Sequence, residues 1–250
     1  WVDNAVGCPV KAGTLHVTPR PPGPAATLVT LVLALLFLLV PIVIAPLPPL
    51  EDYPNHLARF WLLAGGADLP ELAGTYKVVW DALTNIGMDV VAMVATRWVG
   101  FELAGQLMVA AAIVLPPLGG VVLWRAVYGT LHWWTLSFVL LAWSAGLLAG
   151  FLNFEIGLGL ALLAAAAEPL LAGRRPWVGA LARAVLAGGL LFVHAFAFAF
   201  HGALLMALAI GPSLPDAIRR GAWRRTAARI GGAVLSLAVP ALLFVLLAPS

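Results

Sequence analysis

From Pro21 to Leu50 the chain runs for 30 residues without a charged side chain. At about 1.5 Å per helical residue, such a stretch is long enough to cross a bilayer core of about 30 Å. The pattern recurs in four further runs without acidic or basic side chains other than histidine, at 103–124, 126–154, 184–215 and 230–250. Charged residues make up only 10% of the chain, whereas a soluble domain carries roughly a quarter. The sequence therefore predicts an all-α, polytopic integral membrane protein.

The predicted topology is a bundle of about seven spans, with two interfacial helices in the first external loop. The spans are expected near 25–46, 103–124, 133–150, 153–172, 178–193, 197–211 and 230–249. The segment 177–212 leaves two alternatives open, because one continuous helix of that length would measure about 50 Å. A hairpin that turns near His194 is favoured, since arginines flank the segment on both sides and both flanks belong in the cytoplasm.

Three parts of the chain differ in character. Residues 1–26 are rich in Pro and Gly without periodicity, which predicts a disordered cytoplasmic segment. Residues 27–250 form the predicted transmembrane domain, and the loop 51–102 is its only long hydrophilic part. The chain begins with Trp and ends in a helix-like run, so we expect a fragment whose C-terminal spans are missing.

Basic residues gather on one predicted side of the membrane. The layout places eleven of the 14 lysines and arginines in the cytoplasm and eight of the 11 acidic residues outside. Because cytoplasmic loops are enriched in Lys and Arg, the N-terminus is expected inside and the loop 51–102 on the outer face of a bacterial inner (plasma) membrane. The pI near 9.5 is explained by these loop arginines, so no nucleic-acid partner is expected.

The strongest candidate site is the acid pair Glu51-Asp52, which directly follows the first span. If a helix begins there, Asp52, His56 and Arg59 share one face at i, i+4 and i+7. A carboxylate beside lipid can act as a general base, since burial raises its pKa toward a useful range. Acidic residues also occur at such a point simply because a loop is exposed to water. A catalytic role and a purely solvating role for the pair therefore both stay open.

Other polar residues are weaker candidates for substrate contact. Basic and hydrogen-bonding side chains of the external loop are suited to a phosphate, namely His56, Arg59, Tyr76, Lys77 and Arg97. Polar groups near the outer ends of later spans are unusual enough to suggest a role, namely Asn153, Glu155 and His194. Each of them also has an ordinary structural explanation, such as a solvated surface residue or a hydrogen-bonded buried histidine.

The topology and the acid pair together resemble the GT-C superfamily of membrane glycosyltransferases, in which the first external loop carries a paired or near-paired acid motif. The runs Asp-Tyr-Pro-Asn-His-Leu-Ala-Arg at 52–59 and Gly-Phe-Leu-Asn-Phe at 150–154 are also similar to stretches of uncharacterised bacterial relatives. The resemblance covers the whole fragment. Because the motif is short, its specificity comes from the acid pair in combination with the topology.

The resemblance implies transfer of a hexose or pentose from a polyprenyl-phosphate donor to an acceptor glycan, lipid or protein outside the cell. Asp52 would be the base, and Glu51 would position the substrate. Arg59, Lys77 or Arg97 would face the departing phosphate. A divalent metal, Mg or Mn, is left open, because some members use one and others do not; Glu51 and Asp52 would then be its ligands.

Two other classes of function remain as alternatives. A secondary transporter would use Glu155, His194 and His201 as a midplane path for protons or ions. No inverted repeat is legible, and the polar residues concentrate outside the spans, which disfavours a transporter. A non-catalytic membrane subunit is the third class.

The predicted orientation can be tested by cysteine labelling in a Cys8→Ser background. We expect a membrane-impermeant maleimide to label Thr75→Cys on intact cells and Arg174→Cys only after the cells are permeabilised. The reverse pattern would place the loop 51–102 in the cytosol and remove the basis for an extracytoplasmic site.

Overall fold

The structure is a computed structural model that describes residues 22–45, 47–72, 74–221 and 223–247. Residues 1–21 of the predicted N-terminal segment 1–26, including Cys8, lie outside these ranges, whereas Pro24 already begins a helix. Within the described residues every regular element is an α-helix or a 3-10 helix, so the prediction of an all-α chain is confirmed.

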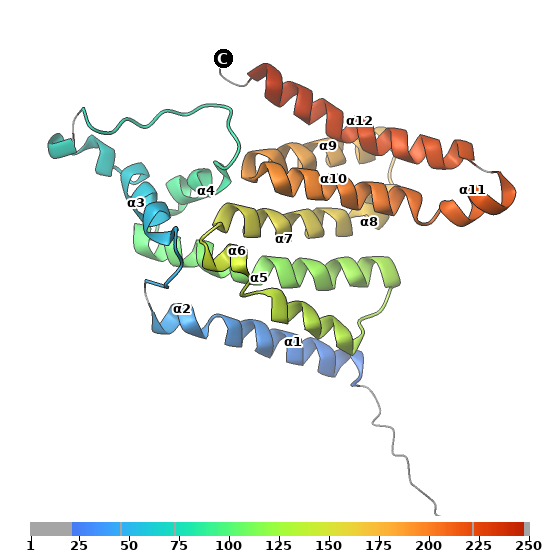
Figure 1. The fold of residues 1–250 in the computed structure, drawn as a ribbon, viewed down its shortest axis with the longest axis horizontal. Helices are drawn as coiled ribbons and strands as arrows, with labels where there is room; N and C mark the ends of the chain where they lie inside the picture. Colours follow the sequence, from blue (N-terminus) through green and yellow to red (C-terminus); the bar gives the residue numbers. More distant parts are fainter. Residues whose placement is uncertain (1–21, 46, 73, 222, 248–250) are drawn as a thin grey trace, which may run out of the picture.

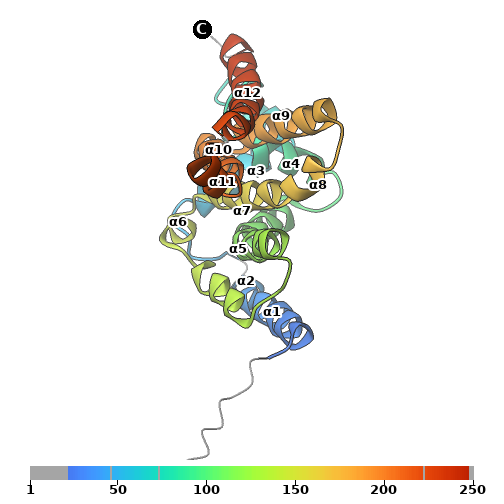
Figure 2. The ribbon, with the colours of Figure 1, turned by 90° about the vertical axis from the view of Figure 1, so that its right-hand side faces the viewer.

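The long helices lie side by side in a stack. They are α1 (Pro24–Leu38) with α2 (Val40–Ile44), α5 (Phe101–Tyr128), α7 (Leu152–Ala166) with α8 (Glu168–Ala172), α9 (Pro176–Val193), α10 (Ala195–Ile210), α11 (Leu214–Arg220) and α12 (Trp223–Leu247). Helix α5 packs along α7, α7 packs on α10, and α12 covers α9 and α10 (Figures 1 and 2). Helices α1 and α2 lie at the opposite edge of the stack (Figure 1).

Five segments of the described chain are long and apolar enough to cross a membrane. They are Pro24–Ile44, Phe101–Tyr128, Leu152–Leu171, Pro176–Val193 and Trp223–Leu247. A sixth is reached if α10 and α11, which meet at 42°, count together as one bent span. These helices agree with a helical membrane protein, and each coincides with an expected span.

The expected span at 133–150 is not one α-helix. It consists of a 3-10 helix, η3 (Trp133–Leu141), and one α-helical turn, α6 (Ala145–Leu148). Polar side chains in this segment bond to nearby backbone: the Thr135 hydroxyl donates to the carbonyl of His132 at 2.7 Å, and Ser144 Oγ accepts from the Leu147 amide at 3.0 Å. Such local bonds compete with a continuous α-helix, and the segment Trp133–Leu148 is an apolar helical stretch shorter than the five long candidate spans.

The hairpin predicted within 177–212 is confirmed. Helices α9 and α10 pack against each other and are separated by His194 alone, whose backbone is extended at φ −166° and ψ 131°. The His194 ring caps α10, since its Nδ1 accepts a hydrogen bond from the Phe196 amide at 3.1 Å. Side-chain acceptors satisfy the free N–H groups of a helix start, which explains why the chain turns at this residue.

Helices α5 and α7 approach closely because glycines lie where they cross. A Cβ atom on Gly159 would lie 2.4 Å from the carbonyl carbon of Leu115, and one on Gly119 would lie 2.7 Å from the Gly159 oxygen. Small residues permit such backbone contact between membrane helices. This crossing fixes the position of α7, whose first turn carries Asn153 and Glu155.

The loop 51–102 folds onto one end of the bundle, where the turn at Gly150 and His194 also lie (Figure 1). It contains α3 (Tyr53–Leu63), two 3-10 turns, η1 (Gly66–Asp68) and η2 (Pro70–Leu72), and α4 (Gly87–Ala95). The two loop helices expected near 53–64 and 85–98 are therefore confirmed as helices.

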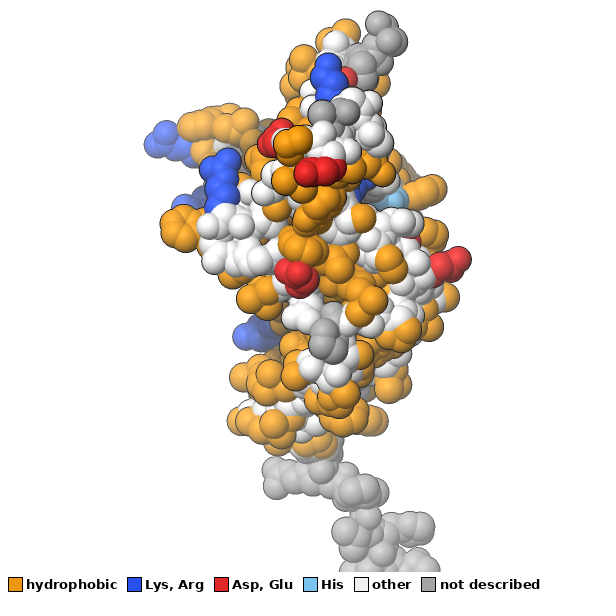
Figure 3. Space-filling view, turned by 90° about the vertical axis from the view of Figure 1, so that its left-hand side faces the viewer, with side chains coloured by type: hydrophobic (Ala, Val, Ile, Leu, Met, Phe, Trp, Pro, Cys, Tyr) orange, Lys and Arg blue, Asp and Glu red, His pale blue; other side chains and the backbone are white. Residues whose placement is uncertain are grey.

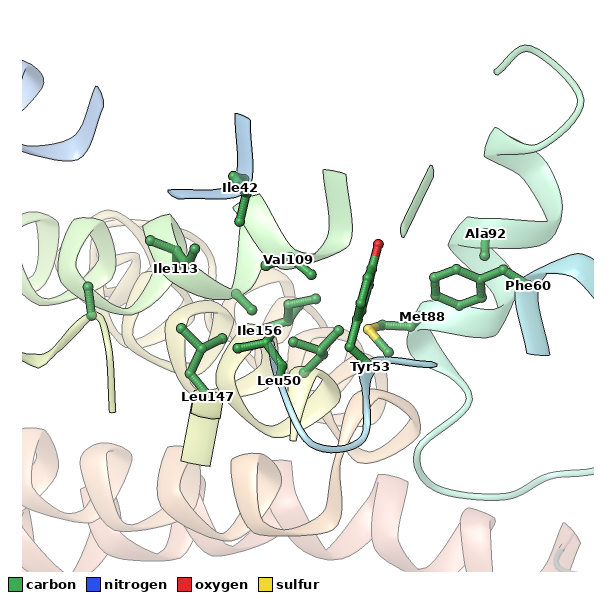
Figure 4. Packing of buried hydrophobic residues seen from close by; sticks show 13 residues of the cluster. Ile42, Leu50, Tyr53, Phe60, Met88, Ala92, Val109, Ile113, Leu147 and Ile156 are labelled. Atoms are coloured by element: carbon green, nitrogen blue, oxygen red, sulfur yellow. The ribbon is translucent and has the colours of Figure 1, made fainter. Parts of the chain in front are cut away.

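Buried apolar side chains join this loop to the spans. Tyr53 and Phe60 of α3 are fully buried and belong to one cluster with residues of α2, α4, α5, α6 and α7 (Figure 4). The labelled members from the other elements are Ile42, Leu50, Met88, Ala92, Val109, Ile113, Leu147 and Ile156. The loop is thus part of the hydrophobic core, which gives its polar face a fixed position.

The α5–α7 crossing predicts opposite effects for two glycine substitutions. We expect Gly159→Ala to destabilise the fold by about 1–3 kcal/mol, because its methyl group must push α5 and α7 apart. Gly189→Ala in α9, where nothing lies within 4 Å of the added atom, should stabilise it by up to about 1 kcal/mol through helix propensity. Thermal unfolding in detergent measures both variants, and a neutral Gly159→Ala would contradict the close crossing.

Candidate functional site

The acid pair is attached to the turn that precedes α7. The Glu51 amide donates to the carbonyl of Leu148 at 3.0 Å, and the Asp52 amide donates to that of Ala149 at 3.3 Å. Gly150 has φ +85°, and a Cβ atom there would lie 2.6 Å from the Asp52 nitrogen. A glycine is therefore required at position 150, both for its backbone conformation and for the close approach of Asp52.

The Asp52 carboxylate is held on both sides. Asn55 donates its amide to Oδ1 at 2.6 Å, and His56 Nε2 lies 3.4 Å from Oδ2. His56 Nε2 also lies 3.1 Å from the carbonyl oxygen of Gly150. Both neighbours of Nε2 are acceptors, so this nitrogen carries the ring proton. Asp52 remains 42% exposed and Glu51 is exposed, which leaves both carboxylates open to a ligand.

Arg59 forms an ion pair with Asp89 of α4. The Asp89 side chain is only 4% exposed, whereas that of Arg59 is 54% exposed. Burial raises the pKa of Asp89, and the neighbouring charges of Arg59 and His56 act in the opposite direction. Asp52, His56 and Arg59 thus occupy one face of α3 as expected, and this face points toward α4 and the Gly150 turn.

A cleft of about 210 Å³ opens beside Arg59, between α3, the extended segment 77–81 and the start of α4. It combines two cations, two acids and an apolar wall that includes an indole ring. The lining residues are Arg59, Leu62, Leu63, Lys77, Val78, Val79, Trp80, Asp81, Leu83, Ile86 and Asp89. Figure 3 faces this end of the molecule and shows charged side chains set among a mostly hydrophobic surface.

The other loop candidates do not line this cleft. Tyr76 is 52% exposed beside Lys77, and Arg97 is exposed in the turn after α4. Asp52 and Glu51 lie outside the lining as well, about two helical turns from Arg59 along α3. The structure therefore brings together Arg59 and Lys77 in the cleft, with Asp52 and His56 further along the same helix face.

Asn153 holds α4 in place. Its Oδ1 accepts from the Met88 amide at 3.1 Å, and its Nδ2 donates to the carbonyl of Asn85 at 2.9 Å. Asn85 has a positive φ of 66°, a conformation that asparagine tolerates better than most residues. Because both ends of its amide bond to the backbone of Asn85 and Met88, Asn153 fixes the start of α4, which lines the cleft.

Glu155 and His194 are bonded within the bundle. Glu155 is 3% exposed, and its Oε1 accepts a hydrogen bond of 2.5 Å from Ser144. The His194 ring packs edge-on against Phe154 at 5.4 Å while it caps α10. Both residues lie at the loop end of the molecule, but neither lines the cleft.

Sequence reasoning missed two residues. Asp89 is the buried partner of Arg59, and the signal was a single acid within the otherwise apolar run Gly87–Ala95. Tyr53 is fully buried, and its hydroxyl, which lies against Gly105, has no hydrogen-bond partner among the described residues. Burial and the nearby charge of Glu102 raise the pKa of Tyr53, so it stays a neutral phenol.

The described residues do not include three or more His, Cys, Asp or Glu side chains grouped so that they could hold a metal ion. Glu51 and Asp52 are neighbours in sequence, but Asp52 is already engaged by Asn55 and His56.

No protein-family model, curated protein or solved structure matches this chain.

The Arg59–Asp89 pair predicts an asymmetry between its two neutralising variants. Arg59→Gln should lower the free energy of unfolding by about 1–3 kcal/mol, because it leaves a buried carboxylate without a counter-charge. Asp89→Asn should lower it by less than about 1 kcal/mol, because water solvates the half-exposed arginine that remains.

The loss in Arg59→Gln should shrink as the pH falls. The stranded carboxylate favours protonation in the folded state, so acid removes the unpaired charge. Thermal unfolding in detergent across pH measures both variants, and equal losses at every pH would contradict a buried charge at Asp89.

Proposed function

We propose that the chain is part of a membrane glycosyltransferase that transfers a sugar from a polyprenyl-phosphate donor to an acceptor on the extracytoplasmic face of a bacterial inner membrane. The observation that carries the proposal is the cleft beside α3, where Arg59 and Lys77 face an apolar wall next to the acid-bearing helix face. The cations suit a phosphate, and the apolar wall suits an isoprenoid or the face of a sugar ring.

Trp80 supports a sugar in this cleft. Trp80 lines the cleft and is 44% exposed, so part of its side chain is accessible to a ligand. Leu62, Leu63 and Val79 extend the apolar surface beside it. A donor would thus bind with its phosphate at Arg59 and Lys77 and with its sugar against Trp80.

The separation of Asp52 from Arg59 suits an in-line displacement. Seven residues of α3 span about 10 Å along the helix axis. In such a displacement the leaving phosphate and the base lie on opposite sides of the anomeric carbon, with reacting atoms about 3 Å apart and hydrogen bonds of about 3 Å at each end. A guanidinium and a carboxylate on the order of 10 Å apart can therefore serve the two ends of one reaction.

In the proposed reaction the acceptor hydroxyl oxygen forms a bond to the anomeric carbon while the bond from that carbon to the phosphate oxygen breaks. The Asp52 carboxylate accepts the hydroxyl proton, and His56 and Asn55 hold the carboxylate in position. The polyprenyl phosphate leaves as an anion that Arg59 and Lys77 neutralise. Arg59 keeps its ion pair with Asp89, and because its side chain is half exposed its other guanidinium N–H groups can donate to the phosphate.

A secondary transporter is supported less well. The three side chains of the expected path form no hydrogen bond to one another among the described residues. Glu155 bonds to Ser144, His194 to the Phe196 amide, and His201 Nδ1 lies 3.4 Å from the carbonyl of Ala161. Each of these bonds goes to a residue outside the expected path, although His201 Nε2 has no hydrogen-bond partner among the described residues.

We expect Asp52→Asn to reduce sugar transfer by about 10²- to 10⁴-fold, the usual contribution of a general base. The assay is release of polyprenyl phosphate from synthetic polyprenyl-phosphate hexoses and pentoses by the full-length protein in proteoliposomes. Asp68→Asn is the matched control, because this exposed acid of the same loop has no side-chain bond within the described residues.

Undiminished release by Asp52→Asn would remove Asp52 as the base. Loss of solute flux in Glu155→Gln, with Asp52→Asn unaffected, would instead support the transporter. If no variant changes release or flux, a non-catalytic subunit is the remaining class.

A further inference from the structure

Arginines gather at the end of the bundle opposite the loop 51–102, where α11 meets α12 (Figures 1 and 2). Five of them lie within eleven residues, namely Arg219, Arg220, Arg224, Arg225 and Arg229. Asp216 is the only acid in this region, and its Oδ1 is 3.9 Å from Arg220 Nη1. Among the described residues this region therefore carries a net positive charge, which Asp216 offsets only in part.

Two of these arginines line a groove of about 100 Å³ between the end of α10, α11 and the start of α12. Its lining residues are Pro212, Ser213, Asp216, Arg225 and Arg229. The Ser213 hydroxyl lies 3.0 Å from the carbonyl of Ala209, to which it donates. The two guanidinium groups are thus the donors that remain for a ligand in the groove.

The charges of Arg225 and Arg229 are balanced only in part, because Asp216 is the one acid among the residues that line the groove. They are four residues apart on one helix, where like charges repel. They also lie in the first two turns of α12, at the positive end of its dipole, and its first turn holds no acidic residue. An anion in the groove would relieve both effects at once.

The height of the groove relative to the bilayer indicates which kind of anion binds there. Helix α12 has 25 residues, which corresponds to about 38 Å, so it exceeds a hydrocarbon core of about 30 Å by about one and a half turns. The arginines therefore lie at head-group height if α12 spans the bilayer. Ile218 and Trp223 beside them are 67% and 55% exposed, and a tryptophan at this height is typical of the interface.

We propose that this groove binds the phosphate of an anionic phospholipid in the leaflet at this end of the bundle. Arg225 and Arg229 donate charge-assisted hydrogen bonds to the phosphate, and the acyl chains lie against Ile218 and Trp223. The site is independent of the proposed sugar transfer, because the loop cleft lies at the other end of the bundle (Figure 1).

The experiment compares lipid binding by the purified full chain in detergent micelles doped with phosphatidylglycerol or with phosphatidylcholine. We expect phosphatidylglycerol to bind more tightly and to raise the melting temperature. Arg225→Gln/Arg229→Gln should weaken this binding by about 30-fold, since each surface arginine contributes roughly fivefold. Arg174→Gln/Arg175→Gln is the control, because these two exposed arginines lie at the same end but outside the groove.

A second variant is expected to bind more tightly, a result that loss of folding could not produce. Asp216→Asn removes the only acid that lines the groove, so it should tighten phosphatidylglycerol binding by up to about fivefold. Equal binding of the two lipids, an equal loss in the control pair, or no gain in Asp216→Asn would each overturn the proposal. Inorganic phosphate that matches the effect of phosphatidylglycerol would also overturn it, because the groove would then bind a small soluble anion.

Discussion

The structure depends on the attachment of the loop 51–102 to the turn before α7. Two backbone hydrogen bonds, from Glu51 and Asp52 to the carbonyls of Leu148 and Ala149, join segments about 100 residues apart in sequence. The burial of Tyr53 directly after them closes the contact against α5. Because a hydrophilic loop has little apolar surface of its own, this anchoring is what allows α3 to hold polar side chains in fixed positions.

Much of the fold could be predicted from the sequence, because a lipid environment requires long uncharged runs and places arginines at their ends. Long uncharged runs located the spans, and arginines on both flanks of 177–212 indicated a hairpin, which the structure contains. The segment 133–150 was harder, since its hydroxyl and histidine side chains bond to local backbone and favour a 3-10 helix. Hydrophobicity measures how well a segment suits lipid, but it does not register these local bonds.

The site could be predicted only in part. The helical spacing of Asp52, His56 and Arg59 placed them correctly on one face, because i, i+4 and i+7 is a property of the helix alone. The partner of Arg59 was not predictable in the same way, since Asp89 reaches it through the packing of α4 on α3. Asn153, predicted as a candidate for substrate contact, bonds to the backbone of Asn85 and Met88, and this structural role was not predicted.

A hydrogen bond and a close packing contact join one side of the cleft to α9. The amide of Ile86, which lines the cleft, donates to the carbonyl of Phe192 at 3.1 Å, and Val193 touches Gly87 so closely that a methyl group there would collide with it. Both contacts fasten the start of α4 to the last turn of α9, a helix long and apolar enough to cross the membrane. A thicker or thinner bilayer changes helix tilt. Because the start of α4 is fastened to α9, a change in the tilt of α9 displaces the Ile86 side of the cleft relative to α3.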